Sequence, residues 1–141
     1  MDKETLHKEI DLIQDVIKRM ANNSFLLKGW LISLIAVVLA LSKDSLLTED
    51  LTYLSLILSI PVLAFWYLDA FFLQKERCYR KLYEWLINNR MNSSEHLYSL
   101  DYKRFKSQVS NILTIMFSKT LLPFYGLTII ILISITLYNI S

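Results

Sequence analysis

The sequence predicts an all-α integral membrane protein with three transmembrane helices and amphipathic cytoplasmic helices. Hydrophobic residues make up 54% of its 141 residues, and it contains only two glycines and two prolines. This composition is unusual for a soluble domain of this length and common in small helical membrane proteins. Apolar runs at residues 25–42, 51–73 and 120–140 are each long enough to cross a hydrocarbon core roughly 30 Å thick.

Residues 1–24 are expected to form a cytoplasmic amphipathic helix before the first span. The apolar side chains recur at steps of three and four residues, which is the spacing of a coiled-coil-like seam: Leu6, Ile10, Ile13, Ile17 and Met20. Such a seam needs a partner surface. A polar pause at residues 22–24 then precedes the first apolar run, residues 25–42, in which Lys28 is the one charged residue.

The second span, residues 51–73, continues without glycine or proline after Pro61 into a strongly charged helix. Its one charged residue is Asp69. A carboxylate at that depth costs roughly 2.5–3.5 kcal/mol on insertion scales and usually faces a partner, a cavity or a water path, so Asp69 is the first candidate functional residue. Residues 74–119 are expected to contain a cytoplasmic stalk helix and a second amphipathic helix, and the third span follows at residues 120–140.

The distribution of cations predicts the orientation of the chain in the membrane. Fourteen of the fifteen Lys and Arg residues precede Gly29 or lie between the second and third spans, and only Lys43 lies in the first connection. Because cationic segments remain cytoplasmic, we expect a multi-pass protein of the bacterial inner (plasma) membrane with a cytoplasmic N terminus and a periplasmic or extracellular C terminus. The net charge of +2 is too small to indicate nucleic-acid binding.

Lys28 and Asp69 are expected to lie at similar depths in antiparallel spans, each roughly 5–6 Å inside the cytoplasmic boundary. The simplest interpretation is an intramembrane ion pair that fixes the register of the two helices. Two alternatives stay open. Asp69 could take part in gating or permeation, because membrane carboxylates often mark ion pathways, or Lys28 could extend to the headgroups and leave Asp69 to another partner.

A second pattern lies on one face of the second span. Its residues follow one another at three- and four-residue steps: Thr52, Ser55, Ser59, Val62, Trp66 and Asp69. Small polar residues favour close helix contact, and a water-filled pore lining is the alternative. Both interpretations predict association. Because one chain with three spans is too thin to enclose a path, a pore would need a homo-oligomer, with a tetramer favoured.

One spacing in the chain has a catalytic character. Arg90 and His96, in RMNSSEH, match the loose pattern of HEPN-type ribonucleases, in which an Arg and a His from two subunits act on a phosphodiester. Arg and His at this separation are also frequent by chance, and here they lie in an expected turn. Since the sequence has no glycine-rich phosphate loop, metal-ligand cluster or nucleophile beside a base, we expect no catalytic site, metal or cofactor.

Residues 65–86, FWYLDAFFLQKERCYRKLYEWL, resemble a segment of small helical inner-membrane effectors of bacterial antiphage defence, including channel-type effectors paired with nucleotidyltransferases or CRISPR components. The resemblance is carried by Asp69, Glu76, Arg77, Arg80 and Tyr83. It implies an oligomeric channel or pore that stays shut until a cytosolic sensor detects infection, with the last four of these residues in a gating stalk. This chain lacks the large sensory domain of some such effectors. The signal is therefore expected from a partner protein, or from a nucleotide or oligonucleotide, that acts on the cytoplasmic helices.

Three functions are therefore compatible with the sequence. The first is a homo-oligomeric channel or pore effector that dissipates the membrane potential when triggered, in the manner of abortive infection. The second is a non-conducting membrane scaffold that anchors a cytosolic enzyme through the first helix and the stalk. The third is a membrane-tethered ribonuclease that uses Arg90 and His96.

Overall fold

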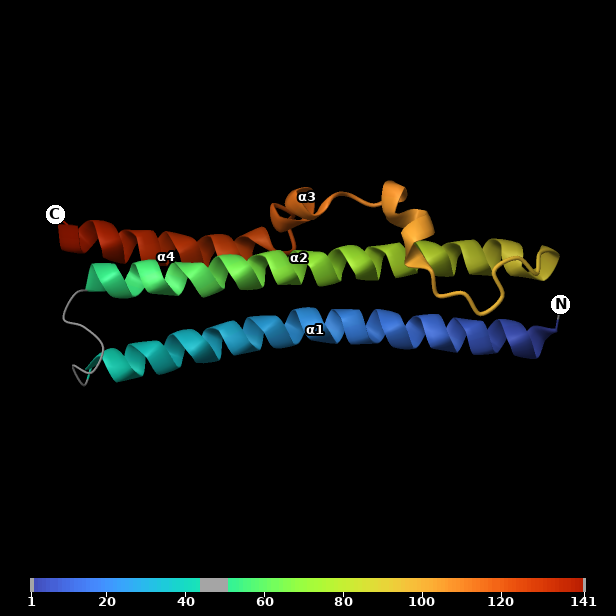
Figure 1. Cartoon of the computed structure of the whole chain (residues 1–141), viewed down its shortest axis with the longest axis horizontal. Helices are drawn as coiled ribbons and strands as arrows, with labels where there is room; N and C mark the ends of the chain where they lie inside the picture. Colours follow the sequence, from blue (N-terminus) through green and yellow to red (C-terminus); the bar gives the residue numbers. More distant parts are fainter. Residues whose placement is uncertain (1, 44–50, 141) are drawn as a thin grey trace.

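The computed structural model describes residues 2–43 and 51–140, and every regular element in these ranges is a helix (Figure 1). Two long antiparallel helices lie side by side, and the rest of the chain returns along the second of them. The elements in chain order are α1 (Lys3–Lys43), α2 (Leu51–Asn89), the 3-10 helices η1 (Arg90–Asn92) and η2 (Tyr102–Gln108), α3 (Ile112–Met116) and α4 (Leu122–Ile140). The prediction of an all-α fold is confirmed.

The hairpin of α1 and α2 has an apolar half and a charged half. We call residues 25–41, 52–73 and 112–138 the apolar half, and residues 2–24 and 74–111 the charged half. The N terminus lies at the charged end, and the C terminus lies at the opposite, apolar end (Figure 1). Helices α1 and α2 are long and apolar enough to span a membrane, and α4 adds a shorter apolar stretch, Leu122–Tyr138.

The apolar side chains of the two long helices point mostly outward. Only 11% of the most apolar stretch of α1 and 28% of that of α2 are buried within the protein. Phe25 of α1 and Ile60 of α2 are more than 60% exposed, and so is Ile130 of α4. A contiguous apolar surface of this extent is typical of proteins that are covered by lipid or by another protein.

The polar pause expected at residues 22–24 does not interrupt the first helix. The amphipathic helix of residues 1–24 was one of the extensions open to the first span, and α1 does run continuously from Lys3 to Lys43. Serine in a helix can compete for backbone hydrogen bonds. Here the hydroxyl of Ser24 donates instead to Asp69 of α2, so the helix continues through this position.

The expectation of a second amphipathic helix within residues 90–119 is wrong. This segment consists of η1, η2 and α3, with extended backbone at Val109 (φ −119°, ψ 143°) between the last two. The side chain of Asp101 accepts a hydrogen bond from the backbone N–H of Lys103, and that of Asn111 accepts one from Thr114. These side chains cap the N termini of η2 and α3, so each begins as a new short helix.

Two hydrophobic cores hold the helices together. In the apolar half, Leu31 of α1, Val62 of α2 and Tyr125 of α4 are all fully buried in one cluster. In the charged half, the cluster combines residues of α1, α2 and η2: Ile13, Ile17, Leu82, Leu86 and Phe105. The seam of the first helix is therefore covered within the chain, because Leu6 and Ile10 also pack against this second cluster.

Two adjacent residues of α2 allow a matched test of the charged-half core. Leu86 is 1% exposed and Ile87 is 47% exposed. We expect Leu86→Ala to lower the free energy of unfolding by about 2–5 kcal/mol, because it leaves a cavity between α1, α2 and η2. Ile87→Ala, the control, should cost less than half as much. Thermal unfolding in mild detergent, followed by circular dichroism, measures both, and equal losses would contradict the packing described.

Candidate functional site

Asp69 is the centre of a buried polar cluster between three helices. Its side chain is 0% exposed. Lys28 of α1 places its Nζ 2.5 Å from Oδ2, Ser24 of α1 donates to Oδ1, and the hydroxyl of Tyr125 of α4 donates to Oδ2 at 2.9 Å. We call these four residues the Asp69 cluster. The carboxylate thus has one cation and two hydroxyl donors, and its charge is compensated without water.

The partners of Asp69 are fixed in turn by their own contacts. Ser24 and Lys28 are one helical turn apart, and Lys28 Nζ also donates to Ser24 Oγ at 3.0 Å. On the other side, the ring of Tyr125 stacks on Trp66 at 5.8 Å between centroids, and Trp66 Nε1 donates to the carbonyl of Met116 at 2.9 Å. The cluster therefore ties α1, α2 and α4 together at the boundary between the two halves.

The polar face of α2 is mostly used for contact with α4. Ser55 Oγ lies 2.6 Å from Thr136 Oγ1 of α4, and Ser55 also donates to the carbonyl of Thr52. Ser59 donates to the carbonyl of Leu56 at 2.6 Å and lies beside an open apolar groove between α2 and α4. In this conformation the face forms a helix contact, as in the simpler of the two interpretations, and α4 covers the positions that a pore lining would use.

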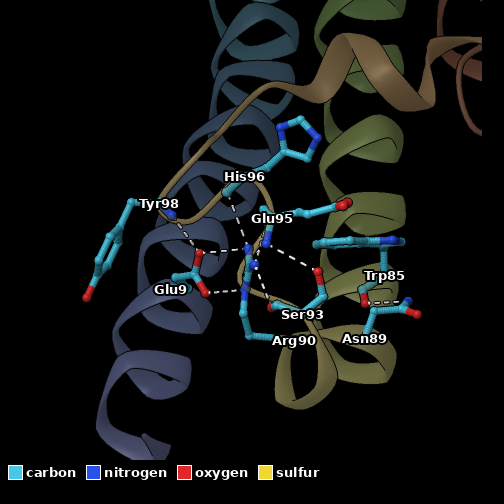
Figure 2. A network of polar contacts seen from close by, with 8 residues as sticks. All are labelled: Glu9, Trp85, Asn89, Arg90, Ser93, Glu95, His96 and Tyr98. Carbon is cyan, nitrogen blue, oxygen red and sulfur yellow. Dashed lines mark hydrogen bonds and ion pairs between the residues drawn. The ribbon is translucent and has the colours of Figure 1, made fainter. Parts of the chain in front are cut away.

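A second buried polar cluster lies near the charged end of the hairpin (Figure 2). Arg90, at the start of η1, is 1% exposed, and Glu9 of α1 is 3% exposed. Arg90 Nε lies 2.7 Å from Glu9 Oε2, and its Nη2 donates to Oε1 at 3.0 Å. Glu9 Oε1 also accepts the backbone N–H of Tyr98 at 2.7 Å. One hydrogen bond and one close charge contact therefore join α1 to the segment after α2.

The chain after Arg90 folds around its guanidinium group. Nη1 donates to the carbonyls of Glu95 and Ser93, at 2.6 and 3.3 Å, and Nη2 donates to that of His96 at 3.3 Å. His96 and Tyr98 both have φ of 54°, in the left-handed region that non-glycine residues seldom adopt. We call Glu9, Arg90 and residues 93–98 the Arg90 cluster.

In this conformation Arg90 and His96 are not arranged as a pair of catalytic side chains. All three guanidinium nitrogens of Arg90 face acceptors of the protein, and the imidazole of His96 points away from them (Figure 2). His96 contributes its backbone carbonyl instead of its side chain. A buried guanidinium that is paired with Glu9 would have to lose this carboxylate before it could contact a phosphodiester.

The expected stalk residues lie on the charged part of α2. Glu76 is largely buried and pairs with Arg80 at 2.7 Å, although the Arg80 side chain is 61% exposed. Arg77 lies on the wall of an open groove between α2 and residues 108–110. Tyr83 packs against the charged-half core. The four residues therefore do not form one cluster, and Tyr83 has a packing role.

Three residues of the two buried polar clusters were missed from the sequence. Ser24 and Tyr125 are neutral hydrogen-bond donors inside otherwise ordinary segments, so nothing in their surroundings marks them as partners of a carboxylate. Glu9 lies in a segment where charged residues are frequent. Its position on the same helix face as Ile13 and Leu6 is the only sequence signal for its burial.

The remaining chemistry of the described residues is sparse. No group of three or more His, Cys, Asp or Glu side chains is placed there to hold a metal ion. Cys78 is 1% exposed, and burial raises the pKa of its thiol, which disfavours the nucleophilic thiolate. Comparison of the chain with protein-family models, with curated proteins and with solved structures found no match in any of the three.

We expect the Arg90 cluster to dominate the stability of the charged half. Arg90→Met should lower the free energy of unfolding by about 3–5 kcal/mol, because it leaves the buried Glu9 carboxylate without a cation. The double variant Glu9→Leu with Arg90→Met should lose less free energy of unfolding than Arg90→Met alone. Thermal unfolding in detergent measures both.

The control for this test is Lys81→Met, which removes a cation from an ion pair with Glu84 in which both side chains are exposed. It should cost about 0–1 kcal/mol. If Arg90→Met costs no more than Lys81→Met, the burial of Arg90 contributes nothing to stability and a chemical role for its guanidinium returns to consideration.

Proposed function

We propose that this chain is a subunit of a homo-oligomeric membrane channel or pore, in a conformation that is shut. The observation that carries the proposal is the Asp69 cluster, a fully buried carboxylate at the inner end of the apolar half, held by residues of α1 and α4. Charged groups at such a depth are costly and are characteristic of ion and gating pathways. Here the carboxylate is compensated and covered, as a closed state requires.

The proposal places α1, α2 and α4 across the membrane as three spans. The 19 residues of α4 extend about 28 Å, close to the thickness of a hydrocarbon core. The charged half, which carries most of the cations, then lies in the cytoplasm, and the C terminus lies outside. Supporting this, the apolar side chains of α1 and α2 point outward, where lipid would cover them.

Opening in this scheme requires α4 to separate from α2. Three polar contacts hold α4 and the segment before it against the polar face: Tyr125 with Asp69, Met116 with Trp66, and Thr136 with Ser55. Their loss would uncover the face, and several copies, four in the arrangement we favour, would then enclose a path between these faces. The trigger would act on the charged half, which shares both long helices with the apolar half.

The biological setting that we propose is antiphage defence in the bacterial inner membrane, with a cytosolic sensor protein or a nucleotide signal as the trigger. Only the resemblance of residues 65–86 supports this part of the proposal.

A non-conducting membrane anchor for a cytosolic enzyme is the second candidate. One observation favours it. The two features that suggested self-association, the apolar seam of the first helix and the polar face of α2, are both covered within a single chain. Conductance in planar bilayers, together with the mass of the purified protein in mild detergent, separates the candidates: a monomer that never conducts would support the anchor and eliminate the channel.

A disulfide between α2 and α4 tests the proposed opening. Ser55→Cys and Thr136→Cys, with Cys78→Ala, replace two hydroxyl oxygens 2.6 Å apart with thiols that are close enough to be linked. We expect oxidation to abolish most of the depolarisation measured with a voltage-sensitive dye, and reduction of the same cells to restore it. Oxidised Ser55→Cys alone is the control. Undiminished depolarisation with the cross-link complete would show that α4 does not need to move.

Substitutions at Asp69 and Lys28 separate stability from conduction. Asp69→Asn should weaken the Lys28 contact and destabilise the protein, because the cation loses its counter-charge. Asp69→Asn with Lys28→Met should recover expression. If the carboxylate also sets the field in a cytoplasmic vestibule, the double variant should still depolarise less, with reduced preference for cations. Depolarisation at matched expression measures this, and unchanged values in both variants would remove Asp69 from the mechanism.

A further inference from the structure

An open, positively charged groove runs along the charged part of α2, beside the segment that connects η2 to α3. It has a volume of about 280 Å³, several times the roughly 30 Å³ share of one water molecule. The residues that line it and carry polar groups are Arg77, Arg80, Lys81, Glu84, Gln108 and Ser110. Three of these six are cations and one is an anion, so the groove favours a negatively charged ligand.

The cations of the groove are available to a ligand. Arg80 is paired with Glu76 and Lys81 with Glu84, and their side chains are 61% and 41% exposed. Because Glu84 is itself 59% exposed, its pair with Lys81 contributes little stability, and a phosphate can replace this carboxylate at small cost. Glu76 is buried and keeps its contact with Arg80, and a phosphate can approach the exposed Arg80 side chain without displacing it. Arg77 makes no ion pair with any residue in the described ranges, and its guanidinium suits bidentate contact with a phosphate.

The opposite wall of the groove is held in place. Gln74, which is 8% exposed, donates from Nε2 to the carbonyl of Ser110 at 2.9 Å. Ser110 is followed by Asn111, which caps α3. Gln108 and Ser110 therefore line the groove opposite the cations of α2, in a segment that a hydrogen bond ties to α2.

The position of the groove along the hairpin identifies the source of the phosphate. Arg77 is four residues beyond Leu73, the last residue of the second apolar run, which is about 6 Å along the helix. The headgroup layer extends about 5–7 Å beyond the hydrocarbon core on each side. With the apolar half in the membrane, Arg77 lies at the level of the lipid phosphates on the cytoplasmic side.

The segment just after the groove fits the same level. In and beside α3, Ile115 is fully buried in the apolar-half core, whereas Leu113 and Phe117 are 65% and 63% exposed. Apolar side chains in this position insert into the boundary between headgroups and acyl chains. They would bring the glycerol end of a lipid beside the groove and its phosphate within reach of Arg77.

We propose that this groove binds the phosphate of an anionic phospholipid of the cytoplasmic leaflet. The proposal rests on the membrane placement given under the proposed function, but not on conduction. The lipid phosphate bridges Arg77 with Arg80 or Lys81, and residues 108–110 close the other side. Lipid bound here links α2 to the segment that leads into α3 and α4, the helix that covers the polar face.

Lipid retention by the purified protein tests the site. The protein, recovered from membranes in mild detergent, is incubated with equal amounts of phosphatidylglycerol and phosphatidylcholine, and bound lipid is measured by native mass spectrometry. We expect phosphatidylglycerol to be retained preferentially. Arg77→Gln with Arg80→Gln and Lys81→Gln should reduce its retention about a hundredfold, since each of the three cations near a membrane surface contributes on the order of 1 kcal/mol and about 1.4 kcal/mol corresponds to a factor of ten. If this variant retains as much phosphatidylglycerol as the unaltered protein, the proposal is refuted.

Two controls keep the result specific. Lys3→Gln with Lys8→Gln removes two charges from exposed positions near the N terminus of α1, far along the hairpin from the groove, and should retain lipid as the unaltered protein does. Arg77→Lys should retain more lipid than Arg77→Gln, because it keeps the charge. Unchanged circular dichroism of each variant confirms that the helices are intact. If the lysine control variant also loses lipid, the effect depends on net charge alone, and the proposed site is refuted.

Two further measurements complete the test. The first distinguishes a lipid phosphate from a soluble phosphate, and the second distinguishes the lipid site from the channel proposal. Excess inorganic phosphate or adenosine monophosphate should not displace the lipid, and if either does so completely, the groove is a site for soluble phosphates instead. The retention measurement does not depend on ion conduction, so its outcome is independent of the channel proposal. A chain that never depolarises cells but retains phosphatidylglycerol through Arg77 would refute the channel and leave the groove intact. A chain that conducts but retains phosphatidylglycerol and phosphatidylcholine equally would support the channel and refute the lipid site.

Discussion

The buried charge of Asp69 is the constraint on which the arrangement of the helices depends. A carboxylate that is 0% exposed among apolar side chains is tolerated only when a cation and hydrogen-bond donors surround it. Lys28 and Ser24 supply these from α1, and Tyr125 supplies a donor from α4. Because the partners come from both neighbours of α2, one side chain sets the register of both helix pairs.

The Arg90 cluster imposes a comparable constraint near the opposite end of the hairpin. Glu9 and Lys28 lie on the same continuous helix, 19 residues or about 28 Å apart. Each holds a buried opposite charge on α2 or on the chain just after it. A shift of α1 along its axis would therefore disturb both clusters together. A conformational change in the charged half that moves α1 would also move the partners of Asp69.

The contacts of α4 differ in kind from those of α1. Helix α1 packs along most of α2 and closes both hydrophobic cores, whereas α4 joins only the apolar-half core and holds α2 through few polar contacts. Polar contacts between helices in lipid contribute modestly, since the separated groups find other partners. Helix α4 also contacts α2 over a shorter length than α1 does.

Much of the fold follows from the sequence, because apolar runs, the scarcity of glycine and proline and the three- and four-residue spacing are local properties of single helices. Asp69 and Lys28 were recognisable as charges within apolar runs. Only the tertiary structure decided that α2 uses its polar face on α4, that Glu9 and Arg90 are buried together, and that residues 90–119 break into short helices. Those outcomes depend on contacts between residues as far as 89 positions apart. Periodicity shows which face of a helix must be covered, but the covering surface is chosen by register, and register is set by such distant polar contacts.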